Sequence, residues 1–95
     1  MGIIKKEIID SNIRCLITST NILESNYNAS TGDLLITFNS GRVYKYKNII
    51  PEVYNKFETA ESHGKFFHGF LKSLPTVRMG DVDPSILTNE IKTKL

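Results

Sequence analysis

The most regular pattern of hydrophobic and polar positions lies in the middle of the chain. Across Leu34–Phe38, the residues at 34, 36 and 38 are large and apolar and point one way, whereas Leu35 and Thr37 point the other way. Residues 39–41 (Asn-Ser-Gly) favour a tight turn. Val43–Lys47 then returns antiparallel, with its tyrosines on one face and its lysines on the other.

Two earlier segments extend this pattern. Asn12–Thr20 is rich in β-branched residues, and Asn21–Asn28 is a half-polar strand that ends in a turn at residues 29–33. We therefore predict an antiparallel β-meander of at least three strands.

The apolar period changes after residue 50. Pro51 is suited to the first position of a helix, and Val53, Phe57 and Ala60 share one helical face. Ser62 is a good N-cap for a second helix, which Pro75 ends. The apolar stripe of that helix consists of Phe66, Phe67, Phe70, Leu71 and Leu74. Two such helices beside a meander predict an α+β fold in which both short helices pack on one face of the sheet.

The two ends of the chain are less regular. The first ten residues fit a short helix or a strand, and we favour a strand for Asn12–Thr20, which could form a hairpin with this first segment. Asp83 and Pro84 predict the start of a short C-terminal amphipathic helix over Ile86–Lys94. This helix either docks on the domain or on a partner, or it frays. We divide the chain into an N-terminal extension (1–18), a central domain (19–75) and a C-terminal tail (76–95).

The composition of the chain is typical of one small globular domain without disulfide bonds. The chain has 95 residues and a net charge of +2, which fit one small globular domain. The segment from Ser40 to Pro75 contains six basic and three acidic residues, so the positive charge is concentrated on the central unit. The single cysteine, Cys15, excludes an internal disulfide and favours a buried thiol in a reducing compartment. With no signal peptide and no run of about 20 apolar residues, we expect a cytoplasmic protein without a membrane partner.

Two interpretations of the tyrosines remain open. Tyr44 and Tyr46 could form a stacking platform for bases, with Arg42 or the helix lysines meeting phosphates. Alternatively, both tyrosines lie in the core, which we favour because the residues at 34, 36 and 38 must face inward. Lys45 and Lys47 would then form a basic strip on the outer face, which either contacts phosphates or is simply solvated.

A second candidate site is the start of the second helix. Ser62, His63, Gly64 and Lys65 combine unpaired helix N–H groups with two side-chain donors, a pattern that suits a phosphate or a carboxylate. An ordinary capped helix start explains the same residues, and we favour that explanation.

Catalytic and metal-binding patterns are weak. His63 and His68 are five residues apart, which is not the spacing of a helical metal pair. Cys15 has no neighbouring base in the sequence. We therefore expect a non-catalytic protein without a cofactor or a metal.

From Ser19 to about Pro75 the chain resembles the KTSC domain, a small module at the C-terminus of some lysyl-tRNA synthetases that also occurs as free-standing bacterial and phage proteins. The resemblance rests on an ordered series: Ser19-Thr20-Asn21-Ile22, Tyr27, Leu34–Phe38, Gly41, Tyr44-Lys45-Tyr46, Ile50-Pro51, Val53-Tyr54 and Ala60–Phe67. His68 departs from the family, which usually has asparagine there. The synthetase association implies RNA binding but no activity.

The sequence leaves two hypotheses for function. The first is a small binding module for RNA or a nucleotide-type anionic ligand. The second is a protein-interaction module, such as a phage-encoded inhibitor or accessory factor that contacts a host protein. A homo-oligomer that pairs exposed strand edges and holds a small anionic ligand between subunits is a variant of the second.

Overall fold

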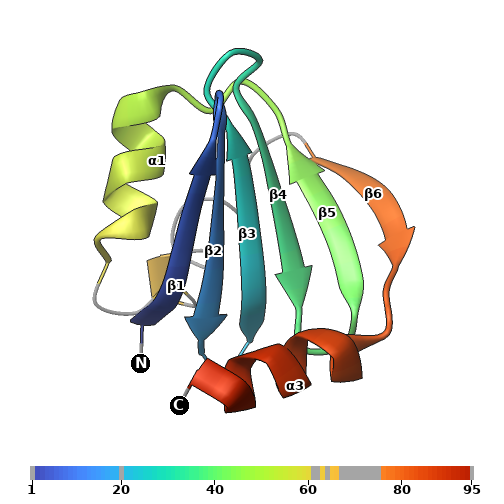
Figure 1. The fold of residues 1–95 in the computed structure, drawn as a ribbon. Coiled ribbons are helices and arrows are strands. Elements are labelled where there is room, and N and C mark those ends of the chain that lie inside the picture. Colours follow the sequence, from blue (N-terminus) through green and yellow to red (C-terminus); the bar gives the residue numbers. More distant parts are fainter. Residues whose placement is uncertain (1, 20, 61–62, 64, 67–75, 95) are drawn as a thin grey trace.

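A single antiparallel sheet organises the molecule. The computed structural model describes residues 2–19, 21–60, 63, 65–66 and 76–94. Its six strands lie in the sheet in the same order as in the chain (Figure 1). They are β1 (Gly2–Ile9), β2 (Asn12–Thr18), β3 (Ile22–Asn28), β4 (Asp33–Phe38), β5 (Arg42–Tyr46) and β6 (Thr76–Asp81).

Tight turns join β1 to β2, β3 to β4 and β4 to β5 and fix the register of these pairs. Asp10 and Gly32 adopt positive φ angles of 54° and 76° in the turns before β2 and β4. Gly41, with φ 91°, precedes β5, and a Cβ atom there would clash with the carbonyl oxygen of Val82. The Val82 N–H donates to the Gly41 carbonyl over 2.8 Å. Glycine at 41 therefore lets the chain after β6 return against the β4–β5 turn.

The main core lies between the sheet and helix α1 (Pro51–Glu58). Tyr54 and Phe57 are the buried residues of this helix. The Tyr54 ring stacks on Tyr27 of β3, with ring centroids 4.2 Å apart, and the Tyr27 hydroxyl donates to the Ile49 carbonyl over 2.7 Å. The buried cluster on this face consists of Cys15, Ile17, Ile22, Tyr27, Leu34, Ile36, Tyr46, Ile49, Tyr54 and Phe57.

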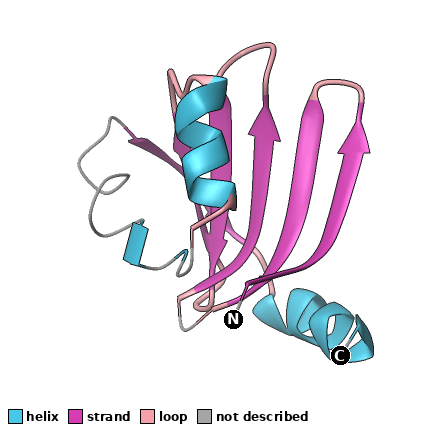
Figure 2. Ribbon diagram, turned by 90° about the vertical axis from the view of Figure 1, so that its left-hand side faces the viewer, coloured by secondary structure: helices cyan, strands magenta, loops and turns pink. Residues whose placement is uncertain are grey.

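A second, smaller core lies on the opposite face under helix α3 (Pro84–Lys94). Leu87 and Ile91 pack there on Leu16 of β2, beside the partly buried Ile4 and Leu23. Figure 2 shows α1 and α3 on opposite sides of the sheet. Because Leu16 lies between two residues of the main core, the period of the strand places it on this face.

The structure confirms the antiparallel meander, the first of the two predicted helices and the C-terminal helix, and it shows that the N-terminal hairpin consists of strands. Of the alternatives for the tail, docking on the domain is the one found. One strand, β6, was not expected, and the C-terminal helix α3 lies on the face opposite α1. The two predicted helices that were placed together on one face are those over residues 51–60 and 62–74, and α1 is the first of them. Most of the predicted helix over residues 62–74 lies outside the described residues.

Candidate functional site

The predicted site residues at 42–47 all lie on β5 or directly after it. Their positions follow from pairing with β4 and β6. Tyr44 lies opposite Ile36 of β4 and Arg78 of β6, whereas Lys45 lies opposite Leu35 and Val77. Facing residues of neighbouring strands share one side of a sheet. The strand therefore directs its tyrosines to the α1 face and Lys45 to the α3 face.

The two tyrosines belong to the core side of the sheet. Tyr46 is 3% exposed, and burial raises the pKa of its phenol to about 12. Tyr44 is half-buried and meets the Phe38 ring edge-on, with centroids 5.9 Å apart. Neither phenol ring lies open on the surface as a stacking platform, which agrees with the favoured interpretation of the sequence.

The outer face around Lys45 is mixed in character. Pairing places Asn26, Leu35, Lys45 and Val77 in one row across β3 to β6. Lys45 and Leu35 are half-buried and Val77 is exposed. The same row continues to Arg14 on β2, where α3 packs nearby. The β3–β6 part of this row forms an accessible surface with one cation, one amide and two apolar side chains.

Several cations on the other strands form ion pairs with carboxylates. Lys6 binds Glu58 over 2.8 Å, and Arg14 binds Glu24 over 2.6 Å. Lys5 binds Glu7 and Glu90, and Arg78 binds Asp81. In the part of the chain that the structure describes, no carboxylate pairs with Arg42, Lys45, Lys47 or Lys56.

Arg42, Lys45 and Lys47, the basic residues of β5 and its end, are together called the cation surface, and the period of the strand places Arg42 on the face opposite Lys45. Arg42 and Lys47 are exposed, and Lys45 is half-buried. Arg42 lies opposite Asp81 in the sheet, but that carboxylate binds Arg78 over 2.9 Å. The charges of this surface therefore have no acidic partner within the described residues.

The second predicted site, at residues 62–65, is described only in part, because Ser62 and Gly64 lie outside the described residues. Lys65 is exposed. His63 is 3% exposed, its Nε2 lies 3.1 Å from the Glu58 carbonyl oxygen, and its ring meets Phe57 edge-on. Burial lowers the pKa of its imidazole, which favours the neutral form. His63 thus lies in the core and not on the surface.

Sequence reasoning did not find the polar cluster around Cys15. The Cys15 Sγ lies 3.5 Å from the Tyr54 hydroxyl and 3.8 Å from Glu58 Oε1. Tyr54 and Glu58 are four residues apart, so a helix predicted from residue 51 places both side chains on the same helical face. Their approach to Cys15 depends on how α1 packs, which the local sequence does not contain.

The Cys15 thiol is held in its protonated form. Its side chain is fully buried, and burial raises the pKa of the thiol. Glu58 accepts from Lys6 at the surface, so the cluster leads from a fully buried sulfur to an exposed ammonium. Ser25 lies opposite Cys15, and its buried hydroxyl has no oxygen or nitrogen partner among the described residues.

The described residues contain neither a membrane-spanning helix nor a cluster of metal-binding side chains. None of their helices is long and apolar enough to cross a membrane. Their histidine, cysteine and acidic side chains form no group of three or more that could hold a metal ion.

Comparison with known proteins identifies the central part of the chain. The model of the KTSC domain family matches residues 18–73, more than half of the chain. A crystal structure of a KTSC domain protein from Yersinia pestis is similar, with a TM-score of 0.64 and 23% sequence identity. The similarity covers 80% of this chain and 97% of that chain. Among curated proteins there is no match.

Proposed function

We propose a binding function for this chain, which belongs to the KTSC domain family through residues 18–73. Its ligand is RNA or another nucleotide-type anion, and the cation surface on β5 is the contact. One observation carries this proposal. Arg42, Lys45 and Lys47 have no carboxylate partner among the described residues, whereas Lys5, Lys6 and Arg14 are each neutralised by glutamates.

The chemistry of the outer face suits a nucleic-acid backbone better than a stacked base. Lys45 lies on β5, and Lys47 is the first residue after the strand ends at Tyr46, so the two cations are close together along the chain. Their ammonium groups can contact neighbouring phosphates of a single strand, and such contacts release counterions. Asn26, in the same row, adds an amide that can both donate and accept.

The buried state of the two candidate nucleophilic or basic side chains supports a non-catalytic role. Cys15 is fully buried with a raised thiol pKa, and His63 is 3% exposed with a lowered imidazole pKa. A cysteine nucleophile acts as its thiolate and must reach its substrate. The Cys15 thiol is protonated and buried, so it meets neither condition. A reduced, buried thiol also fits the cytoplasm, where we expect this protein to act.

Salt-dependent RNA binding tests this function. A labelled single-stranded RNA should bind the full chain at low salt and lose affinity when Lys45 and Lys47 are both replaced by glutamine. Absence of binding at low salt would overturn the proposal.

A second candidate function is protein interaction through the C-terminal extension. Val77 and Met79 on β6 and Val82 and Ile86 beyond it are exposed large apolar side chains. β6 is also an edge strand, which offers backbone groups to another chain. This alternative includes a host protein or a second copy as partner. It predicts that Met79→Lys weakens the complex and leaves RNA binding unchanged.

A further inference from the structure

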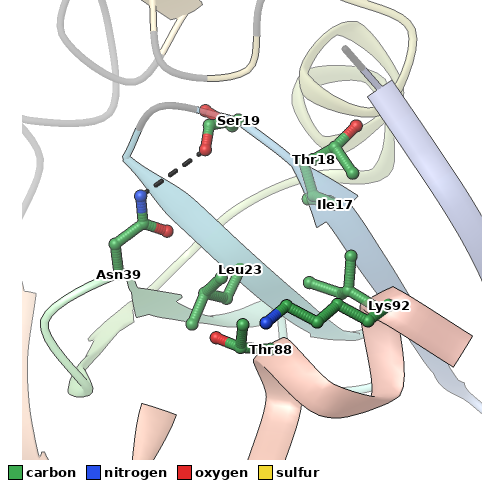
Figure 3. A pocket seen from close by; sticks show the side chains of 8 residues that line it. Ile17, Thr18, Ser19, Leu23, Asn39, Thr88 and Lys92 are labelled. Carbon is green, nitrogen blue, oxygen red and sulfur yellow. Dashed lines mark hydrogen bonds between the residues drawn. The ribbon is translucent and has the colours of Figure 1, made fainter. Parts of the chain in front are cut away.

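A cavity opens where the end of the sheet meets the last turns of α3. Its volume is about 380 Å³. Figure 3 shows Leu23 and Asn39 on the sheet side and Thr88 and Lys92 on α3, all directed toward the same space. A volume of this size falls within the range of small-molecule sites, about 300–1,000 Å³.

The apolar part of the cavity is held in place by the second core. Ile91, a residue of this core, is 7% exposed. Leu23 packs against the cluster that Ile91 forms with Leu16. Leu23 and Ile91 therefore provide a fixed apolar wall for a hydrocarbon group.

The polar part consists of Lys92 and of the hydroxyl and amide groups of four residues, Thr18, Ser19, Asn39 and Thr88. The Thr88 hydroxyl donates to the Pro84 carbonyl over 2.9 Å, and the Asn39 amide lies 3.5 Å from the Ser19 carbonyl oxygen. Lys92 is the charged residue of the lining, and no ion pair within the described residues involves it. The nearest acidic residue on the same helix, Glu90, binds Arg14 instead.

We propose that this cavity binds a small monocarboxylate with an apolar body. Leu23 and Ile91 contact the hydrocarbon, and the Lys92 ammonium binds the carboxylate. A single cation matches the one negative charge of a carboxylate, whereas a phosphate ester carries two charges.

Much of the site lies outside the part of the chain that matches the family. Thr88, Ile91 and Lys92 belong to α3, whereas the family match covers residues 18–73. The cavity is also separate from the cation surface on β5, so its test and the test of RNA binding have independent outcomes.

The test is a titration of the isotope-labelled full chain with octanoate, followed by amide chemical shifts. We expect shifts at Leu23, Thr88 and Ile91 and a dissociation constant of about 1 mM or tighter, as a ligand of this size permits. Lys92→Met keeps the aliphatic stem and removes the charge. It should weaken octanoate binding by about fivefold or more.

Two controls separate the roles of charge and apolar wall. Lys56→Met removes an exposed lysine of α1 that lies outside the cavity lining, and it should leave octanoate binding unchanged. Octanol should bind the unaltered chain as weakly as octanoate binds Lys92→Met. Unchanged shifts at about 10 mM octanoate, equal affinity in Lys92→Met, or octanol binding as tightly as octanoate would each overturn the proposal.

Discussion

The guanidinium of Arg14 in β2 binds the carboxylate of Glu90 in α3 through two nitrogens. Nη2 lies 3.0 Å from Oε1, and Nη1 lies 3.3 Å from Oε2. Glu24 contacts the same guanidinium through Nε over 2.6 Å. This fork joins residues 76 positions apart and fixes the C-terminal helix on the outer face of the sheet.

Glu90→Gln should therefore loosen α3 and lower the melting temperature by a few degrees, because it removes the carboxylate from this pair. Arg14 and Lys5 lower the pKa of Glu90, so its stabilising effect is present above about pH 4.3, the ordinary glutamate value, and is lost as pH falls through the lower folded pKa. Thermal unfolding between pH 7 and pH 3 measures both effects.

Lys92→Gln is the matched control, since it lies on the same helix and has no ion pair within the described residues. Its melting temperature should equal that of the unaltered chain. Equal melting temperatures for Glu90→Gln and the unaltered chain at pH 7 would contradict the role given to Arg14–Glu90.

The buried Cys15 thiol predicts a loss of stability in mild alkali. Its pKa is raised in the fold, so between about pH 8.5, the ordinary thiol value, and the raised value the unfolded chain binds fewer protons than the folded one. The free energy of unfolding should then fall by at most about 1.4 kcal/mol per pH unit. Denaturant titrations from pH 7.5 to pH 9.5 measure this slope.

Cys15→Ala should remove that slope, although it is less stable at every pH because it empties space in the core. An equal alkaline slope in Cys15→Ala would show that another group titrates. Rapid reaction of the native thiol with a reagent such as dithionitrobenzoate would likewise contradict its burial.

His63 predicts the opposite dependence, in mild acid. Burial lowers the pKa of its imidazole, so below about pH 6.5 the unfolded chain binds the proton first and stability falls until the folded pKa is passed. A titration followed by the imidazole resonances should give His63 a pKa below that of the urea-unfolded chain. An unshifted pKa would place the ring at the surface, as an anion site at residues 62–65 requires.

The side of the sheet to which each strand residue points could be predicted from the sequence, because side chains along a strand alternate with a period of two. Leu34 and Ile36 are fully buried, and Tyr46 opposite Leu34 shares their face. Cys15 was also correctly expected to be buried. These residues follow from local alternation and from the number of large side chains that a small core needs.

What could not be predicted depends on contacts between distant parts of the chain. β6 has six exposed residues and a glycine at 80, so it lacks the alternation that marks a strand, and it forms by pairing with β5. Leu16 is buried only because α3 returns to cover it. The absence of acidic partners around Lys45, within the described residues, likewise reflects which glutamates pack near Arg14 and Lys6.

The most direct test of the central claim is the affinity of a fluorescent single-stranded RNA of about 12 nucleotides, measured by anisotropy at several salt concentrations. We expect binding that weakens with salt, and replacement of both Lys45 and Lys47 by glutamine should reduce the slope of log affinity against log salt by about 1.4. Lys56→Gln, which changes an exposed lysine on α1, should bind as the unaltered chain does. No binding at low salt, or equal binding by the double variant, would contradict a role for the cation surface in RNA binding.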